Sequence, residues 1–395
     1  MKRIVEKFIE IILKLSGGIS SLIILLIILF LFKEAGGLFT SPEVEEGYVL
    51  AVNVNNPVQR ISSYDIKEVF DYEIDNWSAV GGNDAEIEVF RMDDINSYYT
   101  DEELGEDYSL LPQRLSELLE SHPNMITFLS KRYIDDEFKG KLLDNEHIKF
   151  KDVFTGKEWY PTSNPAPQFG LVPLILGTLW VSLAAILIAL PLAIGVAIYL
   201  AEIASGRMRS ILKPLIELLA GIPSVVYGFF GLVVIVPLIQ KIFSLPVGET
   251  ALAGSIILAI MALPTIITVS EDALRTAPRA MKEASLALGA SESQTVFRVT
   301  IPYAKSGLIS AAVLGIGRAI GETMAVLMVT GNAALIPSTL LDPARTIPAT
   351  IAAELGEASS GSSHYQALFL LGCILFIITL IISILVERFS KQAGR

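Results

Sequence analysis

The stretch that decides the fold is LGIGRAIGETMAVLMVTGN, residues Leu314–Asn332. Between residues 306 and 341 the only charged residues are Arg318 and Glu322. This run is long enough to cross a bilayer, because a spanning helix needs ~20 mostly apolar residues. A charge at that depth costs roughly 2.5–3.5 kcal/mol, so it normally faces a partner group or a water-filled path. The sequence therefore predicts a membrane-spanning helix, residues 306–330, with a polar face.

The two charges are spaced i,i+4, which in a helix places both side chains on one face, ~6 Å apart along the axis. One interpretation is a structural ion pair inside the membrane. The other is that Arg318 helps to carry an anion across the membrane, with Glu322 beside it. Gly317 and Gly321 have the small-xxx-small spacing that lets a second helix approach closely. We therefore predict two translocation residues and two helix-packing glycines.

Composition indicates an integral membrane protein with a separate acidic part. The chain has 395 residues, of which 52% are hydrophobic, and its mean hydropathy is +0.55. Residues 35–170 hold 11 Lys and Arg against 27 Asp and Glu, a net charge of −16. Nucleic-acid binding needs a basic surface, which argues against that class. Cys373 is the single cysteine, so we expect no disulfide. His122, His147 and His364 lack metal-ligand spacing, so we expect no metal site and place these histidines at the surface.

Six apolar runs are long enough to span a membrane. The first lacks a signal-peptide cleavage pattern, so we expect a retained span. Basic residues gather at both termini and in the loops at 207–213 and 275–305, which predicts cytoplasmic termini. The acidic segment and the 331–364 loop then lie outside. The predicted spans are Leu15–Phe32, Phe169–Ala201, Leu218–Gln240, Ala251–Ser270, the 306–330 helix and Tyr365–Val386.

Residues 35–168 are too regular in their apolar pattern for disorder and predict a small external α/β domain. The fold class is thus an all-α polytopic membrane protein of six helices, divided at 1–34, 35–168 and 169–390. Alternation and capping predict the elements of the external domain. These are strands at 48–54 and 87–90, a helix that begins after Ser62 or Ser63, and helices at 111–122 and 134–145.

The loop 271–305 contains more organisation than a connector needs. Pro278 suits the first turn of a helix that Gly289 would end. Ser291 and Gln294 form a capping-box pattern for a second short helix, which Pro302 would end before the fifth span. Two such helices would form a knob that projects from the membrane. An amphipathic pair lying on the bilayer surface is the alternative.

The segment PRAMKEASLALGASESQTVFRVTIP (278–302) resembles the EAA loop of ABC-importer permeases. The resemblance implies that the six membrane-spanning helices have the type I importer fold. The resemblance implies that the knob docks into a cytoplasmic ATPase subunit. The chain has no G-x-x-x-x-G-K-[ST] motif, so we expect ATP and Mg²⁺ to be bound by partner subunits and no enzyme activity here. The matching residues are Glu283, Ala284, Ser285, Gly289, Val299, Ile301 and Pro302.

Further stretches resemble the phosphate-specific ABC permeases of the PstC type. They are TGKEWYP (155–161), GIPSVVYGFFGL (221–232), LPTIITVSEDAL (263–274) and GIGRAIGETMAVLMVTGN (315–332). In that family the residues matching Arg318 and Glu322 are tied to phosphate transport. The resemblance implies a plasma-membrane complex with a homologous PstA-type permease, an ATPase dimer, an external phosphate-binding protein, inorganic phosphate and membrane lipid. A permease for molybdate or sulfate and a membrane-anchored phosphate sensor are alternatives.

The chain departs from this family in the extra residues 42–148. Residues 48–91 resemble part of a phosphate-binding-protein lobe, but the Gly-Ser-Gly-Thr-like loop expected after Arg91 is absent. Backbone amides bind phosphate best without competing acids nearby, and this segment is strongly acidic. We therefore favour a docking or gating role for the insert over phosphate binding.

Overall fold

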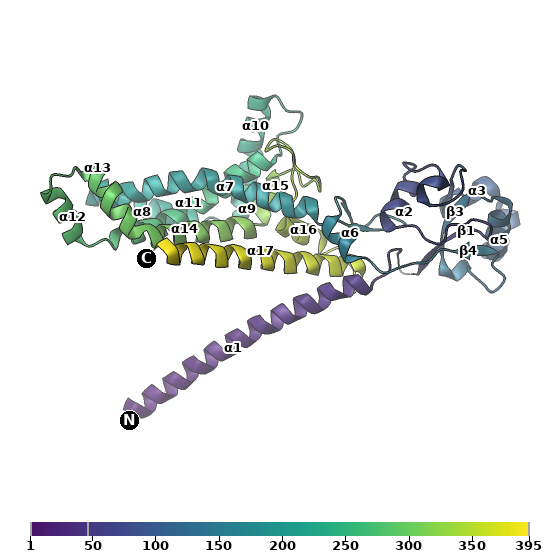
Figure 1. The fold of residues 1–395 in the computed structure, drawn as a ribbon, viewed down its shortest axis with the longest axis horizontal. Helices are drawn as coiled ribbons and strands as arrows, with labels where there is room; N and C mark the ends of the chain where they lie inside the picture. Colours follow the sequence, from purple (N-terminus) through teal and green to yellow (C-terminus); the bar gives the residue numbers. More distant parts are fainter. Residues whose placement is uncertain (1, 46, 394–395) are drawn as a thin grey trace. The chain divides into compact units, whose positions relative to one another are not determined.

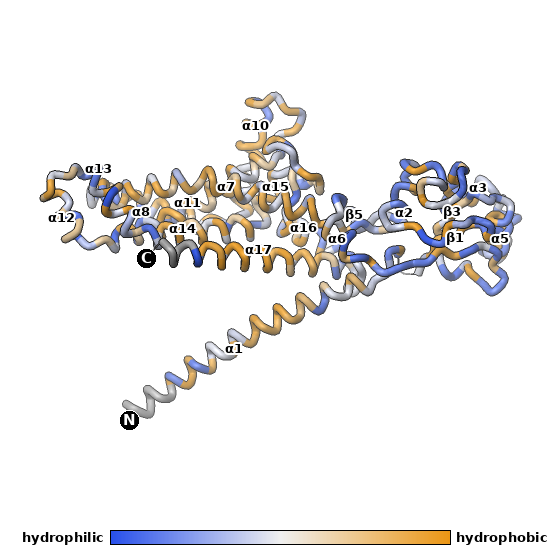
Figure 2. The backbone as a smooth tube through the Cα atoms, viewed as in Figure 1, coloured by the Kyte–Doolittle hydropathy of each residue, from blue (hydrophilic) through white to orange (hydrophobic). Residues whose placement is uncertain are grey.

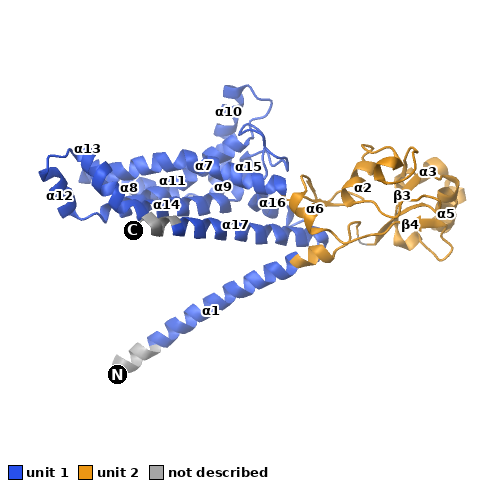
Figure 3. Ribbon diagram, viewed as in Figure 1, with its two compact units in different colours: residues 1–35, 172–395 blue, residues 36–171 orange. Residues whose placement is uncertain are grey.

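The structure is a computed structural model that describes residues 2–45 and 47–393. The chain divides into two compact units, residues 1–35 with 172–395, and residues 36–171 (Figure 3). Long hydrophobic helices make up the first unit, whereas the second mixes short hydrophilic and hydrophobic segments (Figure 2). Met1 and Arg395, which belong to the predicted termini, lie outside the described residues.

Six helices of the described chain are long and apolar enough to cross a membrane. The predicted six-span architecture is confirmed, with ends that differ from the predicted ones by several residues. The spans are Ile9–Thr40, Val172–Ile203, Ser224–Phe243, Ala251–Arg275, Glu292–Gly321 and Ser363–Arg388.

Four long helices form the core of the first unit. α11 (Ala251–Arg275) packs against both α7 (Val172–Ile198) and α14 (Ile301–Gly321), and α14 also packs against α17 (Ser363–Ala393), as Figure 1 shows. Small side chains line these contacts and let the helices approach closely. Buried alanines in this cluster are Ala185, Ala189, Ala193, Ala251, Ala259, Ala262, Ala311, Ala319 and Ala344. The first span, α1 (Lys2–Gly37), meets α17 through Phe30 and Phe369, whose ring centroids lie 5.5 Å apart.

The third span begins later than the predicted Leu218 and is segmented. α8 (Gly206–Ala220) ends before Gly221, and α9 (Ser224–Phe230) begins after Pro223. Proline disfavours helical backbone at the residue before it, which accounts for the interruption. A π-helical turn (Gly231–Ile235) then joins α9 to α10 (Val236–Phe243).

The second unit contains a four-stranded sheet of order β2-β3-β1-β4. β1 (Tyr48–Asn53) pairs antiparallel with β3 (Met125–Ser130) and β4 (Gly140–Leu142), and β2 (Glu88–Phe90) pairs parallel with β3. Helices α2 (Ser63–Phe70) and α5 (Leu111–Ser121) form as predicted, and Ser62 caps α2. The smaller elements are α3 (Ile95–Tyr98), α4 (Asp101–Leu104), α6 (Phe150–Thr155), β5 (Trp159–Tyr160) and β6 (Gln168–Phe169).

Two predictions for this unit are wrong. Residues 134–145 form β4 and extended chain instead of a helix, because Gly140 and its neighbours pair with the end of β1. β3 was not predicted at all, although it is the strand on which β1 and β2 assemble. Its sequence, MITFLS, is a short apolar run, which periodicity alone does not assign to a strand.

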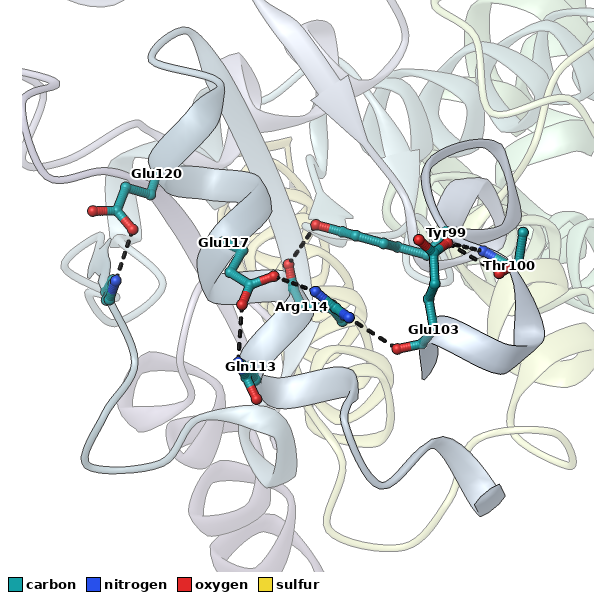
Figure 4. Close-up of polar contacts among 8 residues, drawn as sticks. Tyr99, Thr100, Glu103, Gln113, Arg114, Glu117 and Glu120 are labelled. Atoms are coloured by element: carbon teal, nitrogen blue, oxygen red, sulfur yellow. Dashed lines mark hydrogen bonds and ion pairs between the residues drawn. The ribbon is translucent and has the colours of Figure 1, made fainter. Parts of the chain in front are cut away.

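A polar network fastens α4 to α5 on the surface of the second unit (Figure 4). Arg114 donates to Glu117 Oε2 at 2.7 Å and to the Glu103 carbonyl oxygen at 3.1 Å. The Arg114 hydrogen bond lowers the pKa of the Glu117 carboxyl group. Glu103 in turn accepts from the Thr100 backbone N–H at 2.9 Å, which closes a capping box at the start of α4. These contacts hold α4 against α5.

Candidate functional site

The sequence predicted one helix from residue 306 to residue 330. In the structure this helix is interrupted. α14 ends at Gly321, and the backbone of Glu322 is extended (φ −73°, ψ 133°). A short helix, α15 (Met324–Val329), follows after Thr323. Glycine and threonine are weak helix formers, so tertiary packing can interrupt the helix here at small cost. Non-helical backbone at membrane depth occurs where it is buried in protein or lines a water-filled cavity.

This break corrects the predicted geometry of the charged pair. Arg318 lies in the last turn of α14, whereas Glu322 lies in the break and not on the same continuous helical face. Both residues are described and half-buried, and they form no ion pair within 4 Å. The interpretation as a structural ion pair within this chain is therefore wrong.

Arg318 instead contacts the neighbouring helix α11. Its Nη1 donates to Thr265 Oγ1 at 3.2 Å. A guanidinium carries five N–H donors, and among the described residues no carboxylate lies within ion-pair distance of this one. Arg318 lies in the last turn of α14, directly before the break at Glu322. A guanidinium that no described carboxylate neutralises thus lies beside the helix break.

Tyr227 of α9 packs near the break, in a cluster with Met261 of α11 and Ala325 of α15. Its hydroxyl group donates to the Leu219 carbonyl oxygen at 2.8 Å. The three sequence stretches that were singled out therefore contain helices that pack together, α9, α11 and α15. The sequence did not indicate Thr265 or Tyr227 individually, because neither carries a charge.

The predicted packing glycines are open within this chain. A Cβ added at Gly317 or Gly321 would meet no heavy atom within 4 Å. Other glycines of α14 make the close helix contacts. A Cβ at Gly315 would lie 2.6 Å from Ile266 Cδ1, and one at Gly307 would collide with Ala273. No helix of the described chain packs against the predicted pair.

The loop after α11 folds largely as predicted. α12 (Arg279–Ala287) starts after Pro278, and Gly289 has φ +87°, a conformation that favours glycine. Ser291 and Gln294 form the predicted capping box at the start of α13 (Glu292–Thr295). Pro302, however, does not end a helix. A π-helical turn (Val296–Thr300) joins α13 to α14, so the second short helix is an extension of the fifth span.

The predicted coupling residues divide into exposed and half-buried groups. Glu283 and Ala284 are exposed on α12, and the neighbouring Leu288 is 89% exposed. Ser285 instead shares a hydrogen bond with Thr295 across the turn, at 2.9 Å between the hydroxyl oxygens. Ile301 packs among apolar residues of the spans, and Pro302 is exposed.

Two buried ionic clusters were not predicted. Glu271 of α11 is 1% exposed and lies 2.5 Å from Arg209 and 3.3 Å from Lys213, both of α8. Glu354, the last residue of α16 (Ile347–Glu354), pairs with Arg345 and His364. The prediction of a surface position for His364 is wrong, because its side chain is 13% exposed and lies 2.9 Å from that carboxylate. The paired side chains lie on different elements, so helical spacing does not identify them.

Among the described residues, no group of three or more His, Cys, Asp or Glu side chains is arranged to hold a metal ion. Cys373 is buried as a free thiol.

Comparison with known proteins places the chain in a family. Residues 189–395 match the family model of the binding-protein-dependent transport system inner membrane component. The probable ABC transporter permease protein YqgH of Bacillus subtilis is 40% identical over 241 residues, which cover 61% of this chain and 78% of that protein. The phosphate transport system permease protein PstC of Xylella fastidiosa is 37% identical over 264 residues, which cover 61% of this chain and 80% of that protein.

Among solved structures, the methionine ABC transporter MetNI in inward-facing conformations aligns with 57% of this chain and 96% of its own chain. The sequence identity is 20% and the TM-score 0.46. The family match covers more than half of the sequence, and it includes the helix with Arg318 and the loop with Glu283. The chain therefore belongs to the inner-membrane permease components of binding-protein-dependent ABC transport systems.

Proposed function

We propose that this chain is the PstC-type permease subunit of an ATP-driven importer that carries inorganic phosphate across the plasma membrane. The observation that carries the proposal is the half-buried Arg318 guanidinium, which lies in the last turn of α14 beside a helix break and has no carboxylate within ion-pair distance among the described residues. Guanidinium groups bind phosphate through two parallel charge-assisted hydrogen bonds. The names of several relatives at 37–40% identity support phosphate as the cargo.

Thr265 and Glu322 complete this site. The hydrogen bond from Arg318 to Thr265 fixes one edge of the guanidinium plane and leaves the remaining N–H groups for the anion. Glu322 lies in the break, where its carboxylate opposes the negative charge of phosphate. We assign to Glu322 the role of keeping phosphate binding weak enough for release, since conduction needs sites from which the ion can leave.

α12 is the element that transmits work from ATP. An exposed surface of α12 and the residue that follows it includes Glu283, Ala284 and Leu288, and Leu288 is 89% exposed. A short exposed helix with an apolar side chain at its end is suited to a groove on a cytoplasmic ATPase subunit. ATP and Mg²⁺ are then bound by an ATPase dimer, and the permease itself is not an enzyme.

The remaining assignments concern topology and partners. Both termini lie in the cytoplasm and the 36–171 unit lies outside, as the distribution of basic residues predicts. Gly317 and Gly321 present an open face for a helix of a homologous PstA-type permease. An external phosphate-binding protein delivers the anion. We assign the acidic insert a docking or gating role in that delivery.

Selectivity tests the choice of cargo, because a guanidinium also binds sulfate and molybdate. The whole complex in vesicles should take up labelled phosphate on addition of ATP, and excess sulfate or molybdate should leave that uptake unchanged. Competition by either anion would assign the chain to another oxyanion. ATP-independent binding of phosphate without uptake would favour the sensor alternative.

A further inference from the structure

α12 touches the rest of the chain through one face only. Its half-buried side chains are Lys282 and Ser285, which are spaced i,i+3 and therefore lie on the same side of the helix. All its other side chains are exposed, and none is buried. Apolar packing therefore contributes little to holding α12, and these two polar side chains determine its orientation.

The two side chains reach different spans. Ser285 bonds to Thr295 of α13, which continues into α14, the helix that follows α12 in sequence. Lys282 Nζ instead lies 2.6 Å from Glu202 Oε1, a residue 80 positions away. Glu202 belongs to the π-helical turn (Tyr199–Ile203) at the end of α7. The side chains of Lys282 and Glu202 are 21% and 11% exposed, so water screens this pair only partly.

The end of α7 is itself firmly packed. Ala197, in the last turn of α7, is fully buried in a cluster with Leu274 of α11 and Ala304 of α14. Leu200 lies inside the π-helical turn and is 2% exposed. A displacement of Glu202 is therefore passed on to the three packed spans α7, α11 and α14. Close-packed interiors transmit such displacements instead of absorbing them.

We infer that the Lys282–Glu202 ion pair is the link that makes the cytoplasmic end of α7 move with α12. Without it, α12 remains attached through its chain continuity with α11 and through Ser285, but its motion no longer reaches α7 directly. Lys282 and Glu202 are thus positioning residues, which act through the helices and do not touch the transported anion. This inference rests on the proposed function for its transport readout.

The test uses four variants of the whole complex in vesicles. Glu202→Gln and Lys282→Met each break the pair, and the exchange Glu202→Lys with Lys282→Glu restores it in reverse. Glu217→Gln is the matched control, because Glu217 is exposed on α8 and forms no ion pair among the described residues. Phosphate uptake and ATP hydrolysis are measured on the same vesicles, after co-purification of the ATPase subunits has been checked.

Each single variant should lower the phosphate taken up per ATP by about fivefold or more, while hydrolysis continues. The exchange should return this ratio to within about twofold of wild type, as a restored pairwise contact requires. A wild-type ratio in both single variants, or no recovery in the exchange, would overturn the inference.

A second readout needs no substrate. Spin labels at the exposed positions Ala287 on α12 and Ile203 at the end of α7 report the distance between the two elements. The distance distribution should broaden in each single variant and narrow again in the exchange. If wild-type vesicles take up no phosphate, the proposed function fails, and the distance measurement still decides whether the pair links the two helices.

Discussion

Replacement of Thr265 by valine should weaken transport without harming assembly. The Thr265 hydroxyl oxygen accepts a hydrogen bond from Arg318 Nη1 at 3.2 Å. Among the described contacts of Arg318, this bond is the one that orients the guanidinium plane. Valine has nearly the same shape and cannot accept this bond. Hydrogen bonds to charged groups contribute ~1.5–3 kcal/mol, and the long distance and partial exposure favour the lower value. A loss of ~1.5 kcal/mol corresponds to about a tenfold lower uptake rate at subsaturating phosphate.

Thr265→Ser is the matched control, since serine keeps the hydroxyl group. Initial rates of labelled-phosphate uptake are compared in vesicles that contain equal amounts of the complex. The serine variant should stay within about threefold of wild type, because it can still accept the bond. Uptake by Thr265→Val at the wild-type rate would refute the reasoning, because Arg318 would then need no partner on α11.

Gly177→Ala should lower the free energy of unfolding by about 1–3 kcal/mol in thermal unfolding, because the new Cβ would collide with the carbonyl oxygen of Arg345; an unchanged transition would contradict this packing. Gly317→Leu should leave thermal unfolding unchanged and reduce co-purification of the homologous permease, and full retention of that partner would contradict the open-face assignment. Gly289→Ala should strain the turn after α12 by about 1 kcal/mol and lower phosphate uptake per ATP, and a wild-type ratio would argue against a coupling role for this turn. Burial raises the pKa of Glu43 in the 36–171 unit, so stability there should fall as pH rises from 4.5 through the folded-state pKa. Hydrogen exchange around residue 43 should show this loss in the wild type and not in Glu43→Gln, and equal pH dependence in both would contradict it.

Local features of this chain could be predicted from the sequence. The six spans, the caps at Ser62 and Ser291, and the turn at Gly289 all follow from apolar length or from short-range capping chemistry. Each depends on residues within one or two helical turns. The type of the fold was therefore predictable, and Arg318 became a candidate site residue because a charge inside an apolar run is costly.

Features that depend on tertiary contacts were not predictable. The apolar pattern continues across Glu322, so periodicity gave no sign of the break between α14 and α15. The expected pair of Arg318 with Glu322 gives way to a contact with Thr265, 53 positions away. The Lys282–Glu202 pair likewise joins residues that only the packing of α7 and α12 brings together. Position along one helix cannot report such partners.

Labelled-phosphate uptake by the whole complex in vesicles, with Arg318→Gln compared to wild type, tests the central claim most directly. We predict that uptake in the variant falls to background while the ATPase subunits still co-purify, because glutamine provides neither the charge nor the paired donors. Uptake by Arg318→Gln at the wild-type rate, in a correctly assembled complex, would contradict the claim that this guanidinium carries phosphate through the membrane.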